Sequence, residues 1–168
     1  MKLEDMGWRK FFSEQYGDLK NSGLITGRVV SVTGPVFGVE TEEGRVDAPV
    51  SGHFQYTSSG RADYPAAGDW VLLRGDTGAY MIDKVFERSS RFSRKASGRV
   101  CDEQIIAANI DIMFIVAALD GGRNFTLRGI ERYIVMVREG GARPVILLNK
   151  CDLCMDRDWF MTQTLSVS

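Results

Sequence analysis

The spacing of apolar residues changes twice along the chain. Residues 3–19 mix apolar and charged side chains on a rough helical face that Gly7 interrupts, which predicts a short docking helix. Residues 24–86 form short alternating runs separated by glycine-containing turns, as half-buried strands do. Residues 110–148 contain two continuous apolar runs around an amphipathic segment, which indicates a buried strand–helix–strand unit.

The alternating region predicts five short strands, with one longer irregular connection between the third and the fourth. Their expected ranges are 24–33, 35–41, 44–50, 69–75 and 79–87. Five strands in this order are typical of an OB-fold barrel, and an SH3-like barrel would give much the same pattern. Trp70 and Phe86 are expected in the core of the barrel.

The last part of the chain predicts one strand–helix–strand unit. The run Ile110–Ala118 shows no alternation, so we expect a strand covered on both faces. Asn124 is expected to cap a helix that runs to about Glu139. The stripe of this helix that would face the sheet is Leu127, Ile130, Ile134 and Val137. A second strand is expected at Pro144–Leu148, parallel to the first.

These patterns divide the chain into four expected parts. Residues 1–22 are expected to form an N-terminal helical segment, residues 23–88 the OB-fold barrel, and residues 89–109 a basic linker. Residues 110–168 are expected to form a partial α/β unit. The expected fold class is therefore a five-stranded β barrel followed by part of an α/β domain.

Composition narrows the class of protein without naming a function. The 168 residues are 44% apolar with a net charge of −1, which indicates a globular chain of one or two small domains. The N-terminus lacks the pattern of a signal peptide, and the longest apolar run is too short to cross a bilayer. The three cysteines have irregular spacing and indicate reduced thiols, so we expect a cytoplasmic protein without membrane association.

Two of the cysteines, Cys151 and Cys154, form an isolated C-x-x-C pair, and His53 is the only histidine. A structural zinc site normally has four such ligands, so no metal site is expected in these residues. A thiol-based redox or metal protein built on this pair is the third and remotest function that the sequence offers.

A base-recognition motif follows the second apolar strand. Asn149, Lys150, Cys151 and Asp152 have the N-K-x-D pattern by which many GTP-binding proteins read guanine. The Asp152 carboxylate would accept hydrogen bonds from the N1–H and N2–H₂ groups of guanine, a donor pair that adenine lacks. Asn149 would hold the loop together and approach the O6/N7 edge, the Lys150 stem would pack over the ring, and Cys151 would point elsewhere. The alternative is a polar turn in which Asn149 and Asp152 cap backbone groups.

The phosphate-binding half of a nucleotide site is missing from these residues. No glycine precedes a lysine, which excludes the loop G-x-x-x-x-G-K-[ST], and no aspartate has glycine three residues later. In an ordinary GTP-binding domain both elements precede N-K-x-D. The motif is therefore either a chance match or part of a permuted domain whose phosphate-binding elements come later.

The order of these segments resembles the amino-terminal half of the circularly permuted GTPases that act on the small ribosomal subunit during late maturation. The segments that carry the resemblance, between about residues 7 and 155, are GLITGRVVSV, PAAGDWVLL, RFSRK, AANIDIMFIVAAL, IERYIV and ILLNKCDL. The resemblance implies a barrel that contacts ribosomal RNA and a GTPase stimulated by the small subunit. It also implies GTP or GDP with Mg²⁺ and a structural Zn²⁺, whose ligands these residues lack. The chain alone is thus expected to contact only the guanine base and to be inactive, with no catalytic residue.

A basic segment supplies the candidate RNA contacts, because six cations between residues 84 and 100 face one acid and would neutralise phosphates. The candidate RNA-binding residues are Lys84, Arg88, Arg91, Phe92, Arg94, Lys95 and Arg99. The long connection of the barrel adds a second set, which would either stack on unpaired bases or anchor the loop: His53, Phe54, Tyr56, Arg61 and Tyr64. The alternative for the basic segment is a solvated linker.

Two functions remain after these steps. The first is the amino-terminal part of a ribosome-associated GTPase, with guanine nucleotide and the RNA of the small ribosomal subunit as partners. The second is a non-enzymatic OB-fold RNA-binding or adaptor module in which N-K-x-D is incidental. In both cases the strand at 110–118 would lack a neighbour on one edge, so we expect self-association through this edge or disorder beyond about residue 100.

Overall fold

The chain forms two compact units, Met1–Asn109 and Ile110–Ser168. The computed structural model describes residues 1–17, 23–75, 78–95, 103–120 and 125–167.

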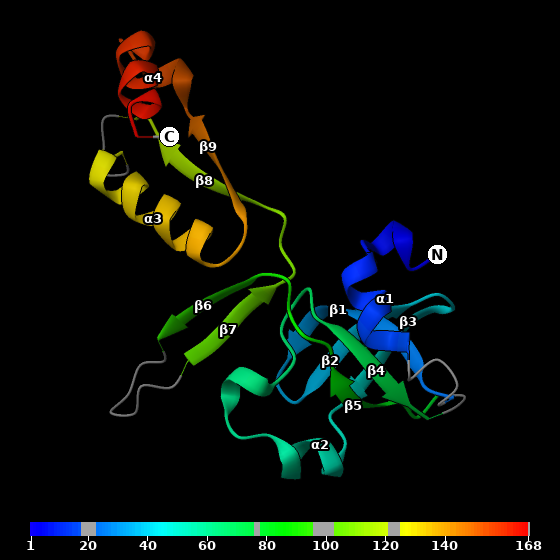
Figure 1. The fold of residues 1–168 in the computed structure, drawn as a ribbon. Helices are drawn as coiled ribbons and strands as arrows, with labels where there is room; N and C mark the ends of the chain where they lie inside the picture. The colour runs from blue at the N-terminus through cyan, green and yellow to red at the C-terminus, as the bar shows by residue number, and fades with distance from the viewer. Residues whose placement is uncertain (18–22, 76–77, 96–102, 121–124, 168) are drawn as a thin grey trace. The chain divides into compact units, whose positions relative to one another are not determined.

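A five-stranded sheet forms the centre of the first unit (Figure 1). Its strands are β1 (Ile25–Thr33), β2 (Val36–Thr41), β3 (Gly44–Pro49), β4 (Trp70–Arg74) and β5 (Met81–Val85). Neighbouring strands are antiparallel, in the spatial order β3-β2-β1-β4-β5. The five strands expected from the alternating pattern are therefore confirmed.

The sheet is not closed into a barrel by a continuous ladder of hydrogen bonds. Within the described part of the chain, the ends of the edge strands β3 and β5 meet at a parallel bridge between Val50 and Ile82. The Ser51 amide also donates to the Ile82 carbonyl at 2.8 Å. The edges thus approach each other, but the barrel that the sequence predicts is not established by the pairing.

The long connection after β3 packs partly into the sheet's core. It contains α2 (Gly52–Thr57), which Ser51 caps by accepting a 3.1 Å hydrogen bond from the Phe54 amide. The Phe54 ring is buried and packs in a cluster with side chains of all five strands: Val29, Phe37, Val39, Ala48, Val50, Val71, Leu73 and Ile82. Phe54 is therefore a core residue, as one of its two expected roles required.

The N-terminal segment packs on the first unit through aromatic side chains. The short helices η1 (Glu4–Met6) and α1 (Lys10–Tyr16) are separated at Gly7, whose φ of +92° favours glycine. Their buried side chains join three residues of the sheet region in one cluster: Met6, Phe12, Trp70, Leu72 and Phe86. The docking helix and the core positions of Trp70 and Phe86 are confirmed.

The segment expected to be a basic linker contains two strands. β6 (Arg91–Lys95) and β7 (Glu103–Ala108) form an antiparallel ribbon. The Ala108 amide donates to the Ala67 carbonyl at 2.9 Å, which ties β7 to the segment just before β4. The linker prediction for residues 89–109 is therefore wrong. Residues 91–95 are polar and show no strand pattern of their own, because their strand conformation depends on pairing with β7.

A buried ion pair joins the start of this segment to β4. The Arg88 guanidinium donates from Nε to Asp69 Oδ1 at 2.8 Å and from Nη2 to Asp69 Oδ2 at 2.7 Å. The Asp69 side chain is fully buried and the Arg88 side chain is 14% exposed. Arg88 also donates to the carbonyls of Ala62 (2.7 Å) and Tyr64 (2.9 Å), so one side chain braces the connection before β4.

The second unit is a strand–helix–strand arrangement followed by a further helix. Its elements are β8 (Ile112–Ala118), α3 (Leu127–Glu139), β9 (Arg143–Asn149), η4 (Cys151–Leu153) and α4 (Arg157–Leu165). β8 and β9 are parallel, as predicted, and α3 buries Ile130, Ile134 and Val137. Helix α4 is an element that the sequence analysis did not predict.

The expected N-cap of α3 is wrong. Asn124 lies outside the described residues, and the helix begins three residues later. Thr126 is the cap, and its Oγ1 accepts a hydrogen bond from the Gly129 amide at 3.2 Å. Leu127, expected in the buried stripe, is only partly buried. Threonine caps almost as well as asparagine, so composition alone did not decide between the two positions.

One face of the second unit's sheet is uncovered. Side chains on the face of β8 opposite α3 are largely exposed, with 60% of Phe114 and 61% of Val116 accessible. The prediction of a strand covered on both faces is therefore wrong for the described residues. Disorder beyond about residue 100 does not hold for residues 103–120 and 125–167, which contain β7 to α4. Self-association through this edge stays a prediction.

No helix in the described ranges is both long and apolar enough to cross a bilayer.

The Arg88–Asp69 pair gives a stability prediction. Arg88→Ala should lower the free energy of unfolding of the first unit by about 3 kcal/mol, because it leaves a buried carboxylate unpaired. Arg88→Lys should restore only part of this loss, because an ammonium cannot donate to both carboxylate oxygens in the same way. Denaturant unfolding followed by tryptophan fluorescence measures both values. The control is Arg91→Ala at an exposed position; equal effects of Arg88→Ala and Arg91→Ala would contradict the bracing role.

Candidate functional site

The N-K-x-D residues lie in a loop at the carboxyl end of β9. Asn149 is the last residue of the strand, and Lys150 has φ +59°, a left-handed conformation that turns the chain sharply. The helical turn η4 then carries Asp152 away from the strand. Because β8 and β9 are parallel, the loop shares its edge of the sheet with the end of β8, where open α/β sheets bind ligands.

Local hydrogen bonds hold the shape of this loop. The Asn149 Oδ1 atom accepts a 2.8 Å bond from the Lys150 amide. The Asn149 carbonyl accepts from the Leu119 amide at 2.9 Å, and the Leu153 amide donates to the Lys150 carbonyl at 3.1 Å. Asn149 therefore caps a backbone group, as the polar-turn alternative expected, while its amide nitrogen remains the atom that would donate to O6 or N7 of a base.

An ion pair links the loop to the neighbouring strand. The Lys150 Nζ atom lies 2.5 Å from Asp120 Oδ2, just beyond the carboxyl end of β8. The Asp120 side chain is 19% exposed and that of Lys150 47%, so the pair lies at the surface. Such a pair orients a side chain more than it stabilises a fold. The sequence patterns did not reveal this contact, which the position of an acid just after β8 could have suggested.

The Asp152 carboxylate is exposed to solvent. Within the described residues no hydrogen bond or ion pair of its side chain is recorded. The residue therefore does not cap the backbone, in contrast to the polar-turn alternative. A carboxylate that is held on a short helical turn and has no partner in the described part of the chain is available to accept from a ligand.

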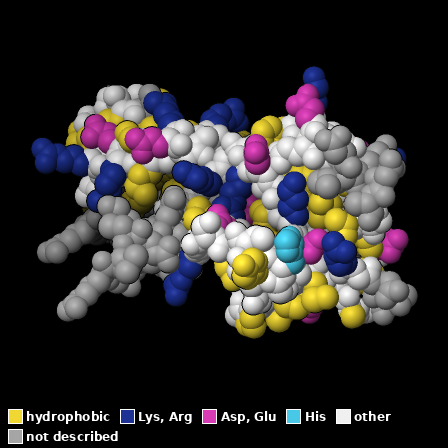
Figure 2. All heavy atoms as spheres, turned by 60° about the horizontal axis from the view of Figure 1, so that its bottom comes forward, with side chains coloured by type: hydrophobic (Ala, Val, Ile, Leu, Met, Phe, Trp, Pro, Cys, Tyr) yellow, Lys and Arg dark blue, Asp and Glu magenta, His cyan; other side chains and the backbone are white. Residues whose placement is uncertain are grey.

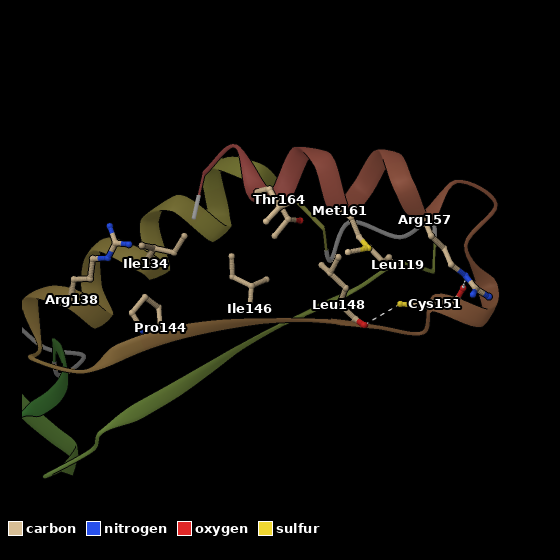
Figure 3. A pocket seen from close by; sticks show the side chains of 11 residues that line it. Leu119, Ile134, Arg138, Pro144, Ile146, Leu148, Cys151, Arg157, Met161 and Thr164 are labelled. Carbon is tan, nitrogen blue, oxygen red and sulfur yellow. Dashed lines mark hydrogen bonds between the residues drawn. The ribbon is translucent and has the colours of Figure 1, made fainter.

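Behind the loop lies an apolar cavity of about 500 Å³ (Figure 3). Its lining comes mainly from β9, α3 and α4, and includes Ile134, Leu148 and Met161. Cys151 also lines it, with its Sγ atom 3.1 Å from the Leu148 carbonyl, and Arg157 donates to the Cys151 carbonyl at 2.8 Å. Cys151 thus points away from the exposed side of the loop, as expected of the variable position.

The structure separates the candidate RNA contacts. Lys84 and Arg91 are exposed and Phe92 is half-buried. Arg88 is engaged by Asp69, so its assignment as an RNA contact is wrong; a cation in a polar run can be a core ion pair, and the sequence does not mark which one. Only the backbone of Arg94 and Lys95 is described, and Arg99 lies outside the described residues.

The aromatic residues of the long connection also differ in their surroundings. Tyr64 packs edge-on against the buried Phe54, with ring centroids 5.7 Å apart. His53 and Arg61 are exposed, and Tyr56 is 91% exposed. On the face drawn in Figure 2, the described basic, acidic and apolar side chains are interspersed rather than gathered in one basic patch.

Comparison with known proteins identifies the family. The sequence profile described as RsgA GTPase matches residues 85–167. The small ribosomal subunit biogenesis GTPase RsgA 2 of Vibrio parahaemolyticus is 37% identical over 161 residues, which cover 96% of this chain and 41% of that protein. The small ribosomal subunit biogenesis GTPase RsgA of Opitutus terrae is 33% identical over 166 residues, which cover 93% of this chain and 45% of that protein.

The chain belongs to the RsgA GTPase family. Two solved structures match its fold. YloQ, described as a circularly permuted GTPase, has a TM-score of 0.62 at 19% identity and covers 85% of this chain and 46% of its own. YjeQ from Thermotoga maritima has a TM-score of 0.64 at 23% identity and covers 85% of this chain and 47% of its own. The chain thus spans less than half the length of these RsgA relatives and solved structures.

The loop contacts predict different effects for two neighbouring substitutions. Asn149→Ala should destabilise the second unit by about 1 kcal/mol, because the Lys150 amide loses its acceptor. Asp152→Asn should change stability by less than about 0.5 kcal/mol, because an exposed group without a partner is altered. Denaturant unfolding followed through the amide NMR signals of β8 and β9 measures both. A larger loss for Asp152→Asn than for Asn149→Ala would show that the carboxylate has a structural role.

Proposed function

We propose that this chain reads the guanine base of GTP or GDP through Asp152 and binds ribosomal RNA through its first unit. It would do so as part of an RsgA-type GTPase of small-subunit biogenesis. The observation that carries the proposal is the exposed Asp152 carboxylate at the carboxyl end of a parallel strand pair. The names of the relatives support the reaction class, since they are small ribosomal subunit biogenesis GTPases.

The geometry of the loop suits guanine. The carboxylate of Asp152 accepts from N1–H and N2–H₂, while the amide nitrogen of Asn149 donates to O6 or N7. Adenine would leave the carboxylate facing an acceptor at N1, which costs the binding of the base. Asp120 holds the Nζ end of Lys150, and the stem of this side chain would pack over the ring.

The RNA-binding part of the proposal rests on the first unit. Its five strands and the Val50–Ile82 bridge fit a partly open OB-fold barrel, an architecture that binds oligonucleotides. Lys84 on β5 and Arg91 on β6 present exposed cations for phosphate contacts.

Hydrolysis by the chain alone is not part of the proposal. Its 168 residues contain no G-x-x-x-x-G-K-[ST] loop to hold the phosphates. The described residues contain no group of three His, Cys, Asp or Glu side chains that could hold a metal ion. The side chains in the described ranges therefore do not fit the Mg²⁺ and Zn²⁺ that the family implies.

Base selectivity tests the guanine site. In NMR titrations, GTP should shift the amide signals of residues 149–153 with an affinity of about millimolar, since base contacts act without charge pairing. Asp152→Asn should transfer the preference from GTP to XTP, because the amide can donate to the xanthine O2 atom where the carboxylate cannot. Asp158→Asn, an exposed carboxylate on α4, is the matched control. An unchanged preference in Asp152→Asn would favour a non-enzymatic adaptor with an incidental motif.

Salt dependence tests the RNA surface. The affinity of the chain for a single-stranded RNA should fall as salt rises, and removal of one phosphate contact should lower the log–log slope by about one. Lys84→Ala and Arg91→Ala should each have this effect, whereas Lys10→Ala on α1 should not. Fluorescence anisotropy over a salt series provides the slopes. Equal slopes in all three variants would place the RNA contacts elsewhere.

A further inference from the structure

Two cysteines flank Asp152 in the motif loop, and the proposed function has not used them. Cys151 and Cys154 are both half-buried, and both carry a free thiol. They are three residues apart in the sequence, with Asp152 between them. Two thiols at this spacing can form a disulfide only where the backbone brings them close together. The local backbone therefore decides whether they act as a pair.

The backbone of η4 holds the two cysteines close together. The Cys154 amide donates to the Cys151 carbonyl at 3.4 Å, which closes a turn of four residues. Such a turn places its first and last α-carbons within about 7 Å of each other, and disulfides join α-carbons that are about 4.4–6.8 Å apart. Side chains three residues apart on a 3-10 turn also lie on the same face. A disulfide between Cys151 and Cys154 therefore requires only a small adjustment of the loop.

The two thiols differ in their surroundings. The Cys151 Sγ atom donates to the Leu148 carbonyl at 3.1 Å, on the wall of the apolar cavity (Figure 3). The Cys151 carbonyl also accepts from Arg157 Nε at 2.8 Å, at the start of α4. Among the described residues no hydrogen bond of the Cys154 side chain is recorded. Cys154 is therefore the thiol that is free to react first, and Cys151 is the thiol that joins the loop to the strand behind it.

A disulfide would remove the contact beneath the loop. A sulfur atom in a disulfide carries no hydrogen, so Cys151 could no longer donate to the Leu148 carbonyl and would turn towards Cys154. The closed ring would also contain Asp152 and Leu153, the two residues between the cysteines. The direction of the Asp152 carboxylate would then be fixed by the ring instead of by the open turn.

We propose that Cys151 and Cys154 form a reversible dithiol–disulfide pair that controls the shape of the guanine-reading loop, with a small-molecule disulfide such as oxidised glutathione as the oxidant. The Cys154 thiolate attacks one sulfur of oxidised glutathione and releases the first glutathione thiolate. The Cys151 thiolate then attacks the Cys154 sulfur of this mixed disulfide and releases the second. The two cysteine protons pass to the two glutathione thiolates, so two cysteine thiols are oxidised while one glutathione disulfide is reduced.

The size of the ring favours a link that opens again. A disulfide across four residues removes little conformational freedom from the unfolded chain, so it gains little stability from this source. Disulfides that are weakly stabilised or exposed have more oxidising potentials than structural ones, and thiols reduce them readily. Formation of the link does not depend on nucleotide, whereas its effect on base binding rests on the proposed function.

Alkylation and mass spectrometry test the link. The whole chain is equilibrated in glutathione buffers of increasing oxidised fraction, and the remaining thiols are then alkylated. The chain should lose two hydrogen atoms and two alkylation sites, and peptide mapping should place the link between Cys151 and Cys154. Cys154→Ser should abolish the link, whereas Cys101→Ser should retain it. A link to Cys101, or a lasting glutathione adduct on Cys154 with Cys151 still alkylated, would overturn the proposal.

Titration with GTP tests the effect on the loop. The amide NMR shifts of residues 149–153 should show an affinity about tenfold weaker for the oxidised than for the reduced chain, a typical coupling between sites. Reduction should restore the affinity. Cys154→Ser is the matched control, because it keeps the contact of Cys151 with Leu148 but cannot close the ring, so its affinity should be equal in both buffers. Equal affinities of the oxidised and reduced wild-type chain would overturn the control of the loop.

The outcomes separate this inference from the proposed function. If the link forms but GTP shifts no signal of the loop in either state, the guanine site and its control by the pair are both contradicted, while the disulfide pair itself stands. If GTP binds with a preference for guanine but no link forms at any glutathione ratio, the guanine site stands and the pair is contradicted.

Discussion

The parallel pairing of β8 with β9 is the constraint on which the candidate guanine site depends. The register runs from Ile112 opposite Arg143 to Ala118 opposite Asn149, so both strands end at the same edge. This places Asp120 beside Lys150 and lets η4 carry Asp152 into solvent. A slip of one residue would move these side chains to the wrong face of the sheet. Asp120 lies beside the motif loop only because β8 and β9, which a helix separates along the chain, are held in register.

The ion pairs of the two units have different structural roles. In the first unit the Arg88 guanidinium is withdrawn from solvent and neutralised by Asp69, and its remaining donors hold the carbonyls of Ala62 and Tyr64. In the second unit the Lys150–Asp120 pair remains at the surface, where it costs little desolvation. The first pair holds the connection before β4 in place, whereas the second orients the Lys150 side chain. Cations that look alike in the sequence thus form a buried ion pair in one place and a surface ion pair in another.

The sequence predicted the strands and the helix whose own apolar spacing marks them. Alternation located β1 to β5, and the stripe of Ile130, Ile134 and Val137 located α3. The sequence pattern did not predict β6, because the polar run at 91–95 becomes a strand only through pairing with β7. The spacing of Asn149, Lys150 and Asp152 predicts a guanine site, and this stays a prediction. Asp120 was missed because its contact with Lys150 depends on the pairing of β8 with β9. Arg88 was misassigned for the same reason, since burial is decided by contacts that are distant in sequence.

An exposed carboxylate gives a nucleotide site selectivity before it gives affinity. Water competes for the exposed Asp152 oxygens, so in the proposed site each hydrogen bond to the base would contribute only about 1 kcal/mol net. The penalty for a wrong base remains, because an acceptor facing an acceptor cannot be repaired by small movements of a loop that Asn149 and Lys150 hold in shape. Strong binding needs cations and backbone donors around the phosphates, which these 168 residues do not supply as a G-x-x-x-x-G-K-[ST] loop. Choice of base and strength of binding are therefore separable properties of this kind of site, carried by different segments of a permuted chain.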